Sequence, residues 1–249
     1  MMGQRLSKKI FHVCMIFVII VIIGFIAVMV MLNYGEKGET DMPFSISKIA
    51  IISTVNGEDV EDVQNKWNFN VTQNNDIYIY IDKNEKHKKQ EIISSVVLDN
   101  FKVKLAPECG KINFYKPSLN DNSLFKNSDE NVAEKIEFKG EKTTDMRNLQ
   151  ISNQGGTIAF RTSNLELGNY ISNDEEQVNH NELLKKMNID ENNLKYQISL
   201  DVTLNLNSGT VFKAEQITIE LPIENVVDLG TVGKEITDMN TIRFKRIEN

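Results

Sequence analysis

The clearest pattern along the chain is a strict alternation of apolar and polar residues from Leu194 to Leu206. Alternation with period two predicts a β-strand with one buried and one solvated face. Asn207-Ser208-Gly209 then predicts a turn, and the returning segment shifts its apolar phase near Glu215-Gln216. A phase shift inside one strand predicts a β-bulge, and Pro222 ends the strand.

A second alternating region lies in the first half of the chain. Apolar residues alternate from Trp67 to Val71 and again from Ile77 to Ile81, with the polar run Gln73-Asn74-Asn75-Asp76 between them. Two alternating arms joined by Asn and Asp predict a β-hairpin that turns at this polar run. The second arm places its isoleucines on one face and Tyr78 and Tyr80 on the other.

The remaining patterns are shorter. Strands are predicted over residues 44–54, 91–105, 111–115, 135–139, 148–152, 157–162 and 242–247, and a short Asn-capped helix over 181–188. The phase slips once within 44–54, and a bend is expected near Asp99-Asn100. The basic residues of the last strand could prevent an exposed sheet edge from pairing with another chain.

These elements predict an all-β domain over residues 44–249, an antiparallel β-sandwich of about a dozen strands with one short helix near 181–188. Residues 118–131 are rich in Asn, Asp and Ser and poor in apolar residues. Such composition is typical of a linker, so a split into two smaller sandwiches at 118–131 is the alternative.

The region before this domain has a different character. Residues 13–32 carry no charge and form an apolar run long enough to cross a bilayer as a helix. Residues 1–12 contain Arg5, Lys8 and Lys9 and no acid, which predicts a short basic cytoplasmic tail and an exported C-terminal part. The run is longer than the apolar region of a signal peptide and lacks a small-x-small cleavage site, which favours a signal-anchor helix. Residues 33–43 predict a flexible stalk.

Charge and composition narrow the class of protein. Beyond residue 32 the chain has 25 basic and 35 acidic residues, a net charge of −10. An acidic surface argues against binding nucleic acid, which requires a basic face. Cys109 is the only cysteine beyond the apolar run, so no disulfide can form within the exported part. The richness in Ile, Asn and Lys is typical of low-GC Gram-positive genomes.

No residue stands out as catalytic, cofactor-binding or metal-ligating. His87 lies in a charged loop over 82–90 and is expected to be solvated, and His180 is expected beside the cap of the short helix. The acidic loop 56–62 and the trio Asn127, Asp129 and Asn131 lack the full ligand pattern of a calcium loop. We therefore expect no cofactor.

Three functions are compatible with this sequence. The first is a non-enzymatic binding or assembly module, held at the cell surface by a single-pass anchor in the lipid bilayer through residues 13–32 and acting on a protein or cell-surface partner. The second is a secreted fibre or matrix subunit released by cleavage of the anchor. The third is a cell-wall glycosidase, which can use paired carboxylates that no motif reveals.

Overall fold

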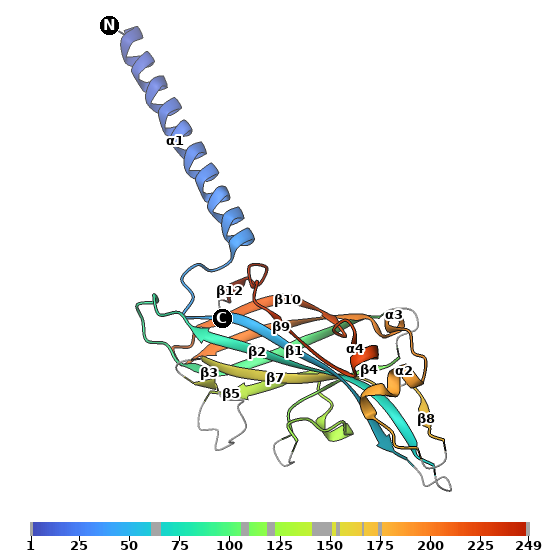
Figure 1. The fold of residues 1–249 in the computed structure, drawn as a ribbon. Coiled ribbons are helices and arrows are strands. Elements are labelled where there is room, and N and C mark those ends of the chain that lie inside the picture. Colours follow the sequence, from blue (N-terminus) through green and yellow to red (C-terminus); the bar gives the residue numbers. More distant parts are fainter. Residues whose placement is uncertain are drawn as a thin grey trace. The chain divides into compact units, whose positions relative to one another are not determined.

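The computed structural model describes residues 2–60, 66–105, 110–118, 123–140, 151–152, 155–165, 167–173 and 176–247. The chain forms two compact units, Met1–Thr40 and Asp41–Asn249. The first consists of helix α1, Met2–Lys37 (Figure 1). Within α1, the segment Met15–Leu32 is apolar and long enough to cross a bilayer, and its side chains are exposed. Because α1 continues to Lys37, residues 33–37 are helical, and the flexible stalk predicted from residue 33 is wrong for those residues.

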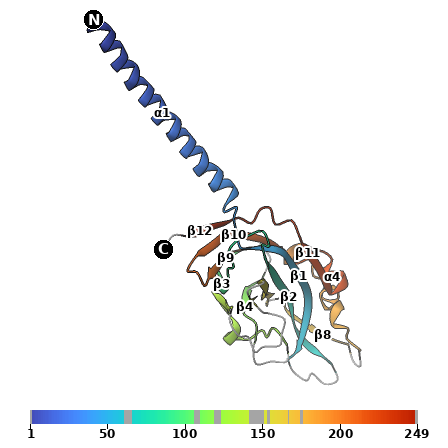
Figure 2. The ribbon, with the colours of Figure 1, turned by 90° about the vertical axis from the view of Figure 1, so that its left-hand side faces the viewer.

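The second unit contains two antiparallel sheets that face each other (Figures 1 and 2). The seven-stranded sheet has the order β11-β1-β2-β7-β4, with β6 beside β7 and β8 beside β2. Its strands are β1 (Phe44–Asp59), β2 (Asn68–Lys83), β4 (Ile112–Tyr115), β6 (Ile151–Ser152), β7 (Gly155–Asn164), β8 (Asn169–Ile171) and β11 (Thr231–Ile236). The five-stranded sheet has the order β12-β10-β9-β3-β5. Its strands are β3 (Ile93–Leu105), β5 (Ile136–Lys139), β9 (Tyr196–Leu206), β10 (Val211–Leu221) and β12 (Phe244–Ile247).

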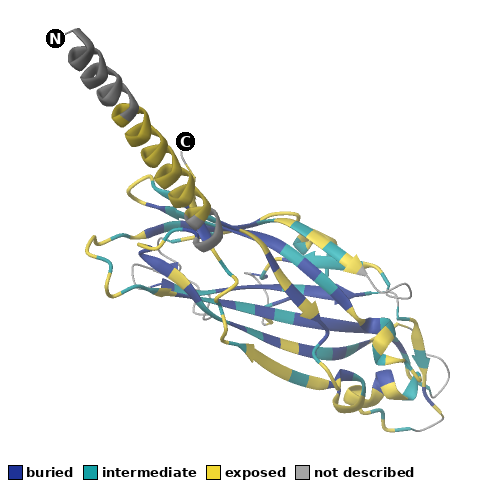
Figure 3. Cartoon of the chain, turned by 90° about the horizontal axis from the view of Figure 1, so that it is seen from above, coloured by how far each residue is buried: buried dark blue, intermediate teal, exposed yellow. Residues whose placement is uncertain are grey.

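The alternation in the sequence determines which side chains fill the space between the sheets. Ile77, Ile79 and Ile81 of β2 are fully buried and pack in one cluster with the apolar residues of β9 and β10. Tyr78 and Tyr80 lie on the opposite, half-exposed face of β2. The alternating burial is visible along the strands of both sheets (Figure 3). The predicted all-β architecture of two antiparallel sheets is confirmed.

Three irregularities in register follow the phase shifts in the sequence. The pairing of β10 with β9 slips between Ala214 and Ile217, where Gln216 has a φ of +56°, so the predicted bulge is confirmed. The pairing of β3 with β9 slips between Asp99 and Lys102, at the predicted bend, with Asn100 at a φ of +54°. In β1 the register slips between Ile46 and Lys48.

The predicted hairpin turn at Gln73-Asp76 is wrong. Strand β2 runs through these residues without a break, and β1 runs through the expected loop at Asn56 to Asp59. The two strands pair from Phe44 opposite Lys83 to Asp59 opposite Phe69, forming one long hairpin. The polar residues 73–76 remain within β2 because other side chains satisfy their polar groups.

The far end of the β1–β2 hairpin extends beyond the five-stranded sheet and has its own small core. Val55, Phe69 and Val71 pack there against the fully buried Leu183 and Leu184. The cover consists of the short helices η2 (His180–Glu182), α2 (Leu183–Lys186), α3 (Glu191–Leu194) and α4 (Val226–Leu229). Residues 180–186 confirm most of the helix predicted at 181–188, whereas α3 and α4 were not predicted.

The described residues 123–131 of the predicted linker pack on the seven-stranded sheet. Phe125 is buried, Lys116 donates a backbone hydrogen bond to Asn131, and the 3-10 helix η1 spans Asp129–Asn131. Both sheets take strands from before and after this segment. The alternative of two sandwiches divided at 118–131 therefore does not describe this fold, because Asn127 bonds to side chains of the sheet and Phe125 is buried against it.

Candidate functional site: a buried polar layer and an open side of the sandwich

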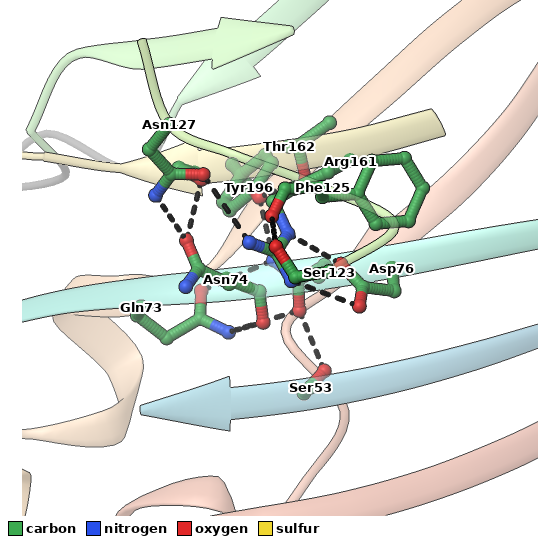
Figure 4. Close-up of polar contacts among 12 residues, drawn as sticks. Ser53, Gln73, Asn74, Asp76, Ser123, Phe125, Asn127, Arg161, Thr162 and Tyr196 are labelled. Atoms are coloured by element: carbon green, nitrogen blue, oxygen red, sulfur yellow. Dashed lines mark hydrogen bonds and ion pairs between the residues drawn. The ribbon is translucent and has the colours of Figure 1, made fainter. Parts of the chain in front are cut away.

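A layer of polar side chains crosses the interior of the second unit (Figure 4). Ser53, Gln73, Asn75 and Thr162 of the seven-stranded sheet are all fully buried. Asn75 Oδ1 accepts from Ser53 Oγ at 2.6 Å and from Gln73 Nε2 at 3.0 Å. Asn75 Nδ2 donates to Gln73 Oε1 at 3.1 Å and to the Tyr196 hydroxyl at 2.6 Å, and that hydroxyl also bonds Thr162 Oγ1 at 2.6 Å.

This layer lies where the covering of the seven-stranded sheet changes. Strand β9 begins at Tyr196, and beyond that point the short helices replace the five-stranded sheet. Ser53 Oγ also accepts from the Ile223 N–H at 2.9 Å, which fixes the chain between β10 and α4. A buried polar network in which each member has a partner specifies one arrangement, because any shift leaves polar groups without partners. We interpret the layer as a structural joint between the two apolar clusters.

A second polar cluster lies on the opposite face of the same strands. Arg161 binds Asp76 through two hydrogen bonds of 2.6 and 3.0 Å. Its guanidinium also donates to Asn127 Oδ1 at 3.3 Å and lies 5.0 Å from the centre of the Phe125 ring. Asn127 Nδ2 in turn donates to Asn74 Oδ1 at 3.0 Å. Asn127 therefore attaches the 123–135 segment to the sheet, and within the described ranges no three His, Cys, Asp or Glu side chains form a metal-binding group.

The outer face of the five-stranded sheet contains a buried carboxylate between the two bulges. Asp201 accepts from the Gln216 N–H at 2.9 Å and from Asn100 Nδ2 at 3.1 Å, and it pairs with Lys213 Nζ at 2.8 Å. Burial of Asp201 opposes ionisation, but the hydrogen bonds from Lys213, Gln216 and Asn100 outweigh it and lower its pKa. The same bond, aided by the charges of Asp201, Asp99 and Glu215, raises the pKa of Lys213. This pair holds the bulges of β3 and β10 against β9.

The two histidines of the second unit belong to different parts of it. His87 Nδ1 lies 2.9 Å from Asp41 Oδ1, and its side chain is only 11% exposed, so the expectation that it is solvated is wrong. His180 begins η2 and packs edge-on against Phe69, with ring centres 4.9 Å apart. They lie near opposite ends of the β1–β2 hairpin, so the structure does not bring them together. Cys109 lies outside the described residues.

Among the described residues, two cavities with space for a ligand lie on one side of the sandwich. This open side lies between the edge strand β11 and residues 215–221 of β10. One cavity of about 390 Å³ includes Tyr196, Leu221 and Pro222 with Lys104, Lys195, Lys234, Glu220 and Glu224 around it. The other, of about 270 Å³, includes Ile49, Ile217, Ile236, Met239 and Ile242, with Glu215 and Asp238 at its rim. Sequence reasoning missed this side because its members come from separate strands.

Comparison with known proteins gives no assignment. No protein-family model matches the chain, and no curated protein or solved structure matches it.

Proposed function

We propose that the chain is a single-pass membrane protein whose extracytoplasmic β-sandwich is a non-enzymatic binding or assembly module. The observation that carries the proposal is α1, whose apolar segment Met15–Leu32 has every side chain exposed. An uncovered apolar helix of this length is stable in a bilayer, where its backbone groups are satisfied internally and its side chains contact lipid.

The charge distribution supports the orientation. Arg5, Lys8 and Lys9 precede the apolar segment and all 35 acidic residues follow it. Positive residues next to a membrane helix favour the cytoplasmic side, so residues 41–249 face outward. The composition supports the surface of a Gram-positive cell as the location.

The polar clusters of the described residues support binding over catalysis. The amides and hydroxyls of the inner layer bond to one another, and Asp76 and Asp201 are each paired with a cation. Groups engaged in this way hold the fold, whereas a general acid or base must reach a substrate. A binding module instead acts through edges and cavities such as those of the open side.

The test is the intact mass of the native protein, measured separately on washed membranes and on culture medium. The proposal expects the full-length mass in the membrane fraction and, in intact cells, removal of residues 41–249 by added protease. A mass in the medium that lacks the first thirty or so residues would instead support the secreted fibre subunit. Protection of residues 41–249 from protease in intact cells would refute the orientation.

A further inference from the structure

The open side of the sandwich exposes one edge of β10 that, beyond Ala214, pairs with no strand among the described residues, although residues 236–242 lie beside its first part at the smaller cavity. Strand β12 pairs with β10 only over residues 211–214, and β9 occupies the other edge of β10. Residues 217–221 therefore present a free edge about 17 Å long, at 3.4 Å per residue. Strand β11, which ends the other sheet, runs along the same side (Figure 2).

The opposite side of the sandwich is closed by aromatic side chains. The Phe101 ring of β3 lies 4.6 Å from Phe114 of β4 and 5.5 Å from Phe160 of β7, measured between ring centres. These rings connect the two sheets. On the open side, the two cavities take the place that these aromatic rings have on the opposite side.

The two cavities lie at successive parts of β10, and the larger one also extends across β9 to Lys104 of β3. The smaller one is bounded by Ile217 of β10 and Ile236 of β11, and the larger one by Leu221 of β10 and Lys234 of β11. A segment laid along the free edge of β10 passes both cavities. Because side chains of a strand alternate, every second residue of that segment would point into the space between the sheets.

The two ends of the open side carry opposite charge. At the smaller cavity the charged lining residues are Glu215 and Asp238, both exposed acids. At the larger cavity three lysines, Lys104, Lys195 and Lys234, exceed the two glutamates. Strand β10 runs from the acidic end to the lysine-rich end, so an antiparallel partner begins at the lysines and finishes at the acids.

We propose that the open side binds an extended peptide segment of a partner protein by antiparallel strand addition to residues 217–221 of β10. The segment has an acidic residue at its N-terminal end, apolar residues at alternate positions, and a basic residue at its C-terminal end. Main-chain hydrogen bonds to the free edge supply affinity, and the cavities and charged ends supply specificity. This inference rests on the proposed function, because it names the partner that the binding module takes.

The test uses the full chain in lipid nanodiscs and two synthetic heptapeptides. The matching peptide is acetyl-Glu-Val-Thr-Ile-Thr-Val-Lys-amide, and the control exchanges its terminal Glu and Lys. Isothermal titration calorimetry should show saturable binding of the matching peptide and about tenfold weaker binding of the control, since two exposed charge pairs change sign. Absence of binding, or equal affinity for both peptides, would overturn the proposal.

Protein variants locate the site. The double variant Glu215→Lys and Asp238→Lys should weaken the matching peptide about tenfold and strengthen the control. Glu137→Lys, on the edge strand β5, adds the same kind of charge elsewhere and should leave both affinities unchanged. Circular dichroism of each variant establishes that it is folded, and Glu215→Gln serves if the double variant unfolds.

Two further outcomes separate this inference from other possibilities. Dimerisation that rises with concentration and is abolished by the double variant would assign the open side to a second copy of the chain, and would overturn the peptide proposal. A membrane-anchored, outward-facing protein that binds neither peptide would overturn the inference while leaving the proposed function intact. The cell fractionation tests the proposed function and the calorimetry tests the peptide site, so a negative result in one does not decide the other.

Discussion

Replacement of Tyr196 by Phe tests the structural role of the buried polar layer. The change removes one hydroxyl and leaves the ring in place. In the native protein this hydroxyl accepts from Asn75 Nδ2 at 2.6 Å and bonds Thr162 Oγ1 at 2.6 Å. Both partners are fully buried, so water cannot replace the lost bonds without entering the interior.

The expected cost follows from the groups left behind. A buried polar group that loses its partner costs about 1–3 kcal/mol. Asn75 Nδ2 keeps its bond to Gln73 Oε1, so its contribution lies at the low end, whereas Thr162 Oγ1 loses its bond to the ring hydroxyl. We expect Tyr196→Phe to lower the free energy of unfolding by about 3 kcal/mol, a large share of a typical 5–15 kcal/mol.

The assay is urea denaturation of the full chain in nanodiscs, followed by far-ultraviolet circular dichroism. Tyr78→Phe is the matched control, because Tyr78 lies on the half-exposed face of β2 and its loss should cost less than about 0.5 kcal/mol. Thr162→Val combined with Tyr196→Phe should cost about 1 kcal/mol less than the sum of the single changes, because the threonine hydroxyl is no longer stranded. A Tyr196→Phe protein as stable as the Tyr78→Phe control would refute the reasoning.

Three further predictions concern other parts of the second unit. The folded state lowers the pKa of Asp201, so the unfolded state binds that proton more tightly. The stability contributed by the pairing of Asp201 with Lys213 should therefore be complete above about pH 5 and should fall as the pH drops below about 4. Urea titrations at several pH values should show that the stability of Asp201→Asn depends less on acid than that of the native protein. Phe125→Ala should destabilise the fold by about 3 kcal/mol and open the 123–135 segment to limited proteolysis, whereas a true linker would be cleaved in the native protein and unaffected by the change. Because Lys213 remains an ammonium beside Asp201, its nitrogen is not nucleophilic toward the neighbouring Asn100 amide, and no isopeptide bond should join these two residues. Peptide mapping by mass spectrometry that finds Lys213 joined to Asn100, with the loss of one ammonia, would contradict this prediction.

The sequence predicts the strands best where alternation is unbroken. The alternation over 194–206 corresponds to β9, and the phase shift after Ala214 corresponds to the bulge of β10. Leu194 matches the phase of the strand but belongs to α3, because one turn of helix can end where an alternation begins. The local pattern alone does not distinguish the first residue of a strand from the last residue of a helix that precedes it.

The polar run Gln73-Asp76 shows why the long hairpin was not predicted. Asn and Asp favour turns when they are solvated, and the sequence does not reveal that a tyrosine more than a hundred residues later bonds Asn75. One signal was available: Gln73 and Asn75 occupy the same odd positions as Phe69, Val71 and Ile77, so the phase of the strand continues through the run. If these residues formed a turn, the phase of the strand would have no reason to continue through them.

The candidate site was beyond reach from the sequence for a related reason. The open side depends on which edge strands lie together, and β10 and β11 belong to different sheets, so no pattern within either strand predicts that they lie on the same side. In the sequence pattern, Ile217 and Ile236 do not differ from other apolar strand residues. Their place beside a cavity follows from tertiary packing.

The position of β1 also determines how the module responds to mechanical load. A pull transmitted from α1 enters at Phe44, at one end of β1, which is paired on one side with β2 along its length and on the other with β11 over residues 49–54. A pull along the strand axis strains these hydrogen bonds together and does not open them one at a time from an end. Tension on the N-terminal side therefore meets a strand that is hydrogen-bonded to a neighbour on both of its edges, so the load is spread over many bonds at once.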